Sequence, residues 1–193
     1  YMLTSLSSTG NYRGIYTNRS NVEIRNGTVK GFPSNGIKDA ATSMGTRIIN
    51  VRVLNNGGSG IHLQGNGALV TGCTAKENAG IGIYLYGTSN IVKDCISFSN
   101  GVDGIRGARG SVITGNTCYD NGARGIEASH DAVITGNSCY KNVTTGIYAG
   151  NGCTIQGNSC RENMQHGISA GGSSIIGNSC HSNTTFGIAL GVH

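Results

Sequence analysis

The stretch from Gly146 to His166, GIYAGNGCTIQGNSCRENMQH, decides the fold. Three segments of it, GIYAG, CTIQG and SCREN, place apolar residues two positions apart, which is the periodicity of a β-strand. Each segment is too short for a helix. Glycine and asparagine lie between the segments, as tight turns require. The stretch therefore predicts three short strands joined by turns.

This pattern recurs along nearly the whole chain of 193 residues. The dipeptide Gly-Ile returns at intervals of 20 to 24 residues, which is the period of a solenoid. Leucine-rich repeats have a similar length, but their leucine pattern and helix-forming half are absent. The glycines of this dipeptide are Gly14, Gly36, Gly60, Gly82, Gly104, Gly125, Gly146, Gly167 and Gly187.

Aligning the repeats produces columns of apolar residues, and each column suits the inside of a buried parallel strand. The first strands contribute Ile15, Ile37, Ile61, Ile83, Ile105, Ile126, Ile147, Ile168 and Ile188. The second strands contribute Ile24, Ile48, Val70, Val92, Ile113, Ile134, Ile155 and Ile175. The third strands contribute Val29, Val53, Ala75, Ser97, Cys118, Cys139, Cys160 and Cys180. We therefore predict that the cysteines are core residues with free thiols, including the neighbours Cys73 and Cys95.

The bend between the second and third strands uses only Gly, Asn and Asp, which tolerate a positive φ. These residues are Asn26, Asn50, Gly72, Asp94, Gly115, Gly136, Gly157 and Gly177. Two columns of asparagine accompany the turns and predict hydrogen-bonded ladders. One contains Asn116, Asn137, Asn158 and Asn178, and the other contains Asn56, Asn78, Asn100, Asn121, Asn142, Asn163 and Asn183.

Together the columns predict an all-β fold, a right-handed single-stranded parallel β-helix solenoid. It has about eight rungs of 20–24 residues with three short strands per rung. We assign residues 1–13 to an N-terminal lead-in or partial rung and residues 14–193 to the repeat domain. Neither end carries a recognisable cap, which predicts a truncated domain or self-association through the uncapped ends.

The rung pattern I-x-G-N-x-x-x-x-N-x-x-x-G-I, present as ITGNSCYKNVTTGI from Ile134 to Ile147, resembles the pectate-lyase-like superfamily of β-helices. That superfamily includes pectate lyases, polygalacturonases, alginate epimerases and phage tailspikes. The resemblance implies an extracellular, periplasmic, cell-surface or virion-surface location. It also implies that the first-strand face carries any active site. It does not choose among functions, because one fold supports many.

The net charge and its distribution indicate which classes of binding partner are suitable. The net charge of +5 favours a polyanion such as an acidic polysaccharide, but the 14 Lys and Arg residues are scattered and predict neither a nucleic-acid nor a membrane partner. No apolar run approaches the roughly 18 residues that span a bilayer, and no export signal begins the chain.

Outward residues of the first strands form the main candidate site. Aromatic rings and cations at rung spacing suit a sugar chain that carries carboxylates. We predict ligand binding by Tyr16, Lys38, His62, Tyr84, Arg106 and Tyr148. If the protein is an enzyme, the candidate catalytic residues are Lys38, His62, Tyr84, Arg106 and Glu127, with Asp103, Arg124, His130 and His166 at the strand ends. The alternative is that all of these are ordinary solvated strand residues.

A second stripe, on the third strands, contains Phe98, Tyr119 and Tyr140 between basic residues. It is either ordinary strand surface or a candidate for self-association or sugar binding, whereas base stacking is disfavoured because no nucleic-acid module accompanies it.

Signatures of the known enzymes are missing from the sequence. The acids are too few and isolated for a calcium cage, no paired aspartates occur, and Asp-Pro-His-Asp is excluded because Pro33 is the only proline. We predict no cofactor, and no metal site, because the histidines lack a common face or ligand spacing. Two functions stay open. One is a structural or glycan-binding module, favoured because the regular repeats leave no room for an insertion that would wall a cleft. The other is a lyase or C5-epimerase acting on uronate polymers.

Overall fold

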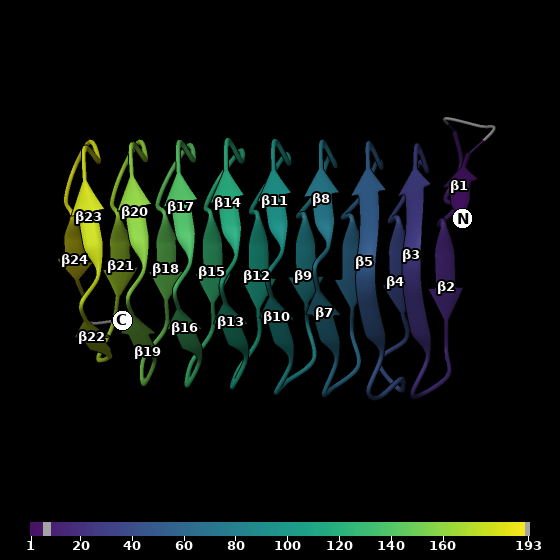
Figure 1. Ribbon diagram of the computed structural model, residues 1–193, viewed down its shortest axis with the longest axis horizontal. Coiled ribbons are helices and arrows are strands. Elements are labelled where there is room, and N and C mark those ends of the chain that lie inside the picture. Colours follow the sequence, from purple (N-terminus) through teal and green to yellow (C-terminus); the bar gives the residue numbers. More distant parts are fainter. Residues whose placement is uncertain (6–8, 192–193) are drawn as a thin grey trace.

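The chain coils into a solenoid in which each strand pairs in parallel with its counterpart one turn along (Figure 1). The computed structural model describes residues 1–5 and 9–191. All the regular secondary structure within these ranges consists of β-strands. The described part of the chain accordingly has no helix that is long and apolar enough to cross a membrane. The predicted all-β parallel solenoid of about eight turns is confirmed.

The first strands form a sheet of nine. They are β2 (Ile15–Thr17), β4 (Ile37–Asp39), β6 (Ile61–Leu63), β9 (Ile83–Leu85), β12 (Ile105–Gly107), β15 (Ile126–Ala128), β18 (Ile147–Ala149), β21 (Ile168–Ala170) and β24 (Ile188–Leu190).

The second and third strands belong to one sheet of 15 strands. The second strands are β7 (Leu69–Thr71), β10 (Ile91–Lys93), β13 (Val112–Thr114), β16 (Val133–Thr135), β19 (Thr154–Gln156) and β22 (Ser174–Ile176). The third strands are β8 (Thr74–Lys76), β11 (Ile96–Phe98), β14 (Thr117–Tyr119), β17 (Ser138–Tyr140), β20 (Ser159–Arg161) and β23 (Ser179–His181). β1 (Met2–Thr4) pairs with the end of the first long strand, β3 (Glu23–Lys30).

The prediction of three strands in every rung is wrong for the first two rungs. There the second and third segments are continuous, as β3 and β5 (Arg47–Leu54), and Gly27 pairs with Val51 across the bend. From the next rung on, a side chain accepts the hydrogen bond of the backbone N–H after the bend. Cys73 N donates to Cys95 Sγ at 3.4 Å, and Cys95 N donates to Asn116 Oδ1 at 3.0 Å. Those rungs lose the backbone pairing that would join the two strands.

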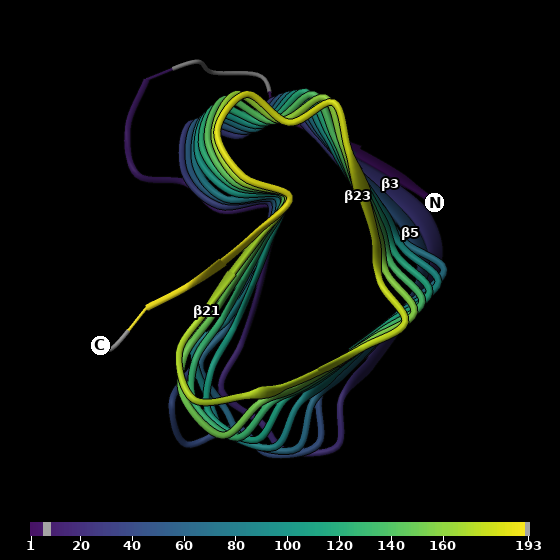
Figure 2. The ribbon, with the colours of Figure 1, turned by 90° about the vertical axis from the view of Figure 1, so that its left-hand side faces the viewer.

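The predicted columns form the core. The isoleucines of the first strands from β4 to β21 are fully buried, as are Cys118, Cys139 and Cys160. All seven cysteines are free thiols. At the last turn the column opens to solvent, where Cys180 is half-buried and Ile188 is 42% exposed. Viewed along the axis, successive turns superimpose around this core (Figure 2).

The turns also behave as predicted. All eight residues of the bend column have a φ between 52° and 66°. Both asparagine ladders are present: Asn121 Nδ2 donates to Asn142 Oδ1, and Asn137 Nδ2 donates to Asn158 Oδ1, each at 3.0 Å. These bonds satisfy buried amides while fixing the distance between turns. The outward side chains therefore repeat at a constant spacing of about 4.8 Å.

Candidate functional site

The first-strand face is the outward surface of the nine-stranded sheet, and it collects every residue predicted for ligand binding. Register pairing joins these residues in one continuous line: Tyr16, Lys38, His62, Tyr84, Arg106, Glu127 and Tyr148. The side chains lie side by side because each occupies the same outward position of its rung.

A stack of rings and a guanidinium occupies the middle of this face. The rings of His62 and Tyr84 lie 4.7 Å apart with an interplanar angle of 19°. Arg106 lies over Tyr84, with its guanidinium carbon 5.6 Å from the ring centroid. His62 and Arg106 come from the rungs on either side of Tyr84, so they cover opposite faces of its ring.

Beyond Tyr84, two carboxylates and two guanidiniums balance one another. Arg106 Nε lies 2.9 Å from Asp103 Oδ2 and 3.0 Å from Glu127 Oε2, and Arg124 Nη1 lies 2.5 Å from Glu127 Oε2. Asp103 is fully buried and also accepts the backbone N–H of Arg124 at 3.0 Å. Burial alone would lower the pKa of Arg106, but its hydrogen bond to Asp103 and the two acidic charges raise that pKa. The pKa of Glu127 is raised, mainly by burial, and the charges of Arg106 and Arg124 offset this only in part.

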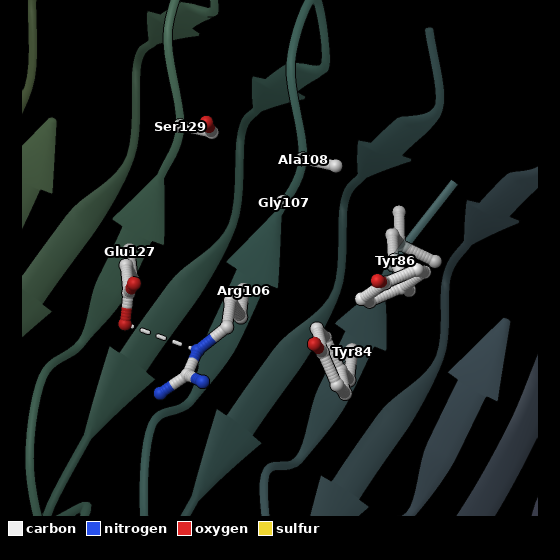
Figure 3. Close-up of a pocket in the computed structure, with 8 residues that line it drawn as sticks. Tyr84, Tyr86, Arg106, Gly107, Ala108, Glu127 and Ser129 are labelled. Carbon is white, nitrogen blue, oxygen red and sulfur yellow. Dashed lines mark ion pairs between the residues drawn. The ribbon is translucent and has the colours of Figure 1, made fainter. Parts of the chain in front are cut away.

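Two pockets adjoin this cluster. The smaller, of about 250 Å³, lies at the carboxyl ends of the strands and is lined by Tyr84, Tyr86, Arg106, Glu127 and Ser129. In Figure 3 Arg106 lies between Tyr84 and Glu127 and is joined to Glu127 by the ion pair. The larger pocket, of about 490 Å³, lies at the amino ends of the strands. It is lined among others by Arg124, Thr144, Tyr148, Gln165, His166 and Ser169.

The amino-terminal end of the face is different, because its cations are not balanced. None of the ion pairs among the described residues involves Lys38 or Arg13. The pKa of His62 is lowered to about 4, first by burial and then by the charges of Lys38 and Arg13. His62 is therefore a neutral imidazole near pH 7, beside two cations that are available to an anion.

Unpaired polar atoms gather at both ends of the face. Six buried side-chain nitrogen or oxygen atoms of the described residues have no hydrogen-bond partner, and four of these belong to the face or its edge. They are Arg13 Nε, His62 Nε2, Thr144 Oγ1 and His166 Nδ1. Buried polar atoms are rarely left unpaired, and exceptions mark places where a ligand or water can bind.

The third-strand face is the outward surface of β8, β11, β14, β17, β20 and β23. Phe98, Tyr119 and Tyr140 stack there with centroids 4.6 and 4.9 Å apart and interplanar angles of 7° and 0°. Lys76 lies 5.4 Å from the Phe98 centroid, and Arg161 lies 4.2 Å from that of Tyr140. The ring faces are thus covered by one another and by the two cations, so this ladder offers no open ring for a sugar or base to stack on.

Some functional candidates were missed by reading strand positions alone. Arg13, Thr144 and Gln165 precede the strands rather than lie on them. A signal was available for Arg13, which stands two residues before a first-strand isoleucine, as do Asp103, Arg124 and His166. His130 does not join the site, because it lies exposed in the turn after β15 and accepts the backbone N–H of Asn151 at 3.1 Å.

The site shows no arrangement suited to a metal ion. Within residues 1–5 and 9–191, no group of three or more His, Cys, Asp or Glu side chains is placed to hold one.

Solved structures similar to this chain share its fold. A mannuronan C-5 epimerase A-module from Azotobacter vinelandii matches with a TM-score of 0.79 and 21% identity, over 87% of this chain and 55% of that one. A periplasmic alginate epimerase matches with a TM-score of 0.73 and 17% identity, over 93% of this chain and 58% of that one. The Dettilon tailspike protein matches with a TM-score of 0.63 and 17% identity, over 95% of this chain and 50% of that one.

The chain thus spans little more than half the length of the two epimerases. No curated protein matches its sequence. The family model described as the right handed beta helix region matches residues 4–106 and 35–185, and the chain belongs to this right-handed β-helix family.

Proposed function

We propose that the first-strand face binds an acidic polysaccharide. The carrying observation is the pair of unbalanced cations, Lys38 and Arg13, next to the neutral ring of His62. A carboxylate placed there would gain charge-assisted hydrogen bonds without displacing an existing ion pair. The smaller pocket farther along the face supplies depth for a neighbouring sugar unit.

The similar structures support this ligand class. Two are named as alginate or mannuronan epimerases and one as a tailspike. One of the epimerases is described as periplasmic, and a polysaccharide ligand of this kind suits a periplasmic, extracellular or virion-surface location for this chain too.

A second candidate is a lyase or C5-epimerase that acts on uronate polymers. It is favoured by the stack of His62 on Tyr84, which places a neutral imidazole beside a phenol, since the reaction removes a proton from C5 while a cation neutralises the carboxylate. The pKa of about 4 counts against His62 as the base, because a general base works best with a pKa near the working pH. Binding is therefore the primary proposal.

The test is calorimetric titration with alginate and polygalacturonate oligosaccharides of the wild type, Lys38→Gln and Lys93→Gln. Lys93 lies outward on β10, in the other sheet, so both variants change the net charge equally. We expect Lys38→Gln to weaken binding about tenfold, the loss of one charge-assisted hydrogen bond, and Lys93→Gln to have little effect.

Equal effects of the two substitutions would show non-specific charge attraction and contradict the proposal. No binding of any acidic chain would favour a purely structural module. Catalysis is tested separately with the same polymers. Exchange of the C5 proton for solvent deuterium would indicate an epimerase, and ultraviolet absorbance of unsaturated uronates a lyase.

A further inference from the structure

The larger pocket differs chemically from the end of the face that carries Lys38. Its wall contains hydroxyl, amide and imidazole groups from Thr144, Gln165, His166 and Ser169. Thr144 Oγ1 and His166 Nδ1 are both buried, and neither has a hydrogen-bond partner in the described structure. Leaving such an atom unpaired costs about 1–3 kcal/mol, so a ligand group that pairs with it gains affinity.

The charges in this pocket are already balanced. Arg124 and Arg106, which line it, are paired with Glu127 and Asp103. A second carboxylate entering the pocket would have to compete with these acids for the guanidiniums. The pocket therefore suits an uncharged ligand rich in hydroxyl or amide groups.

The cationic end of the face and the larger pocket lie apart along one line of paired residues. From Lys38 the register passes through His62, Tyr84, Arg106 and Glu127 to Tyr148, which lines the larger pocket. Five steps at about 4.8 Å separate Lys38 from Tyr148 by roughly 24 Å, a distance that one oligosaccharide can span.

We infer that the preferred ligand is a heteropolysaccharide that contains both acidic residues and neutral, hydroxyl- or amide-bearing sugars. The acidic unit binds at Lys38 and Arg13, and a neutral unit binds in the larger pocket. This inference rests on the proposed function and narrows it, because a uniform polyuronate would bring a carboxylate to both ends.

The experiment compares hyaluronan oligosaccharides, which alternate glucuronate with N-acetylglucosamine, with polygalacturonate oligosaccharides of equal length. Calorimetry is run on the wild type and on the double variant Thr144→Val and His166→Phe. Valine keeps the shape of threonine without its hydroxyl. Phenylalanine keeps the ring that stacks on Phe186 at 5.4 Å. The matched control is Thr154→Val with His181→Phe, the same two substitutions on β19 and β23.

The wild type should bind the hyaluronan oligosaccharide about tenfold more tightly than the polyuronate. The double variant should lose that preference and keep its affinity for the polyuronate, while the control should behave as the wild type. Thr144→Val alone, measured beside the thermal unfolding of each variant, keeps the test valid if the double variant folds poorly. Its backbone N and O retain their bonds to Ala123 and Gln165.

A wild type that prefers the polyuronate, or a double variant that loses affinity for both polymers equally, would overturn the inference. In either case Lys38→Gln would still weaken polyuronate binding, and the proposed function would stand. If the wild type binds neither polymer, the proposed function and the inference both fail.

Discussion

The first-strand face and the third-strand face both carry aromatic rings and cations on successive rungs of the solenoid. They differ in how many of their polar groups have a hydrogen-bond partner. On the third-strand face, three aromatic rings in successive rungs stack nearly parallel and are covered at both ends by cations. On the first-strand face, ring, guanidinium and carboxylate alternate. Two pockets open there, and within the described part of the chain four buried polar atoms of this face lack a partner.

The difference shows how repetition affects function in a solenoid. A rung spacing of about 4.8 Å matches the stacking distance of aromatic rings, so identical neighbours satisfy each other and close their surface. Side chains of different kinds in successive rungs do not cover each other in this way. An irregular column therefore retains the chemistry that a ligand needs, whereas a regular column stabilises the fold.

Disrupting the asparagine ladder that fixes the distance between rungs should have the largest effect on stability, because both faces depend on that distance. Asn121 Nδ2 donates to Ser97 O at 3.1 Å and to Asn142 Oδ1 at 3.0 Å, and its own Oδ1 accepts from Asn100. Asn121→Ala leaves several buried polar groups unpaired. We expect it to lower the free energy of unfolding by about 3 kcal/mol, measured by urea denaturation followed by circular dichroism.

Asn66→Ala is the control for this change. Asn66 is exposed and its Oδ1 accepts the backbone N–H of Thr88 at 2.9 Å, a bond that water can replace. We expect a loss below about 1 kcal/mol. Similar losses for the two variants would mean that the buried ladder does not hold the rungs at their spacing.

Removing the central ring of the third-strand face should affect stability but not binding. Tyr119 contacts a ring on each side, at 4.6 and 4.9 Å. Each such pair contributes about 0.5–1.5 kcal/mol beyond burial, so Tyr119→Ala should lower the free energy of unfolding by about 2 kcal/mol. Calorimetry should show unchanged affinity for acidic oligosaccharides.

The counterpart on the other face is Tyr84→Ala. It removes the ring between His62 and Arg106 and part of the wall of the smaller pocket, so it should weaken oligosaccharide binding. If Tyr119→Ala weakens binding as much as Tyr84→Ala does, the closed ladder is itself a ligand surface and the contrast between the faces is wrong.

Much of this fold could be predicted from the sequence, because each rung repeats the same local requirements. Asn26 and Gly115 both predict a positive φ, and both have one, because that conformation restricts residue type directly. Continuity of β3 and β5 could not be predicted in this way. It depends on whether a side chain one turn away, such as Asn116, accepts a backbone hydrogen bond.

The candidate site could be predicted only as a line of residues. Period and register place Lys38 and Arg106 on one face, but they do not say that Asp103 and Glu127 balance Arg106 while Lys38 has no ion pair with any residue the structure describes. That difference depends on side-chain conformations at the strand ends. The pocket lined by Thr144 and His166 was missed for the same reason.

The smallest expected effect is on how stability depends on pH, to which we expect His62 on the first-strand face to contribute. The pKa of His62 is about 4 in the folded chain, below its ordinary value of 6.5. Between these values the unfolded chain binds a proton that the folded chain does not, so stability falls as the pH drops from 6.5 to 4. His62→Gln should remove this component, on the order of 1 kcal/mol once solvent screening of the partly exposed ring is allowed for.

Urea denaturation at several pH values, with His181→Gln as control, measures this effect. His181 also neighbours a cation, since it pairs in register with Arg161, but it is exposed on the third-strand face. His181→Gln leaves His62 in place and should keep the part of the slope that comes from His62, whereas His62→Gln should remove that part. If His62→Gln also retains the slope, the folded chain accommodates a third positive charge beside Lys38 and Arg13. The first-strand face would then be more strongly cationic in weak acid than a neutral His62 allows.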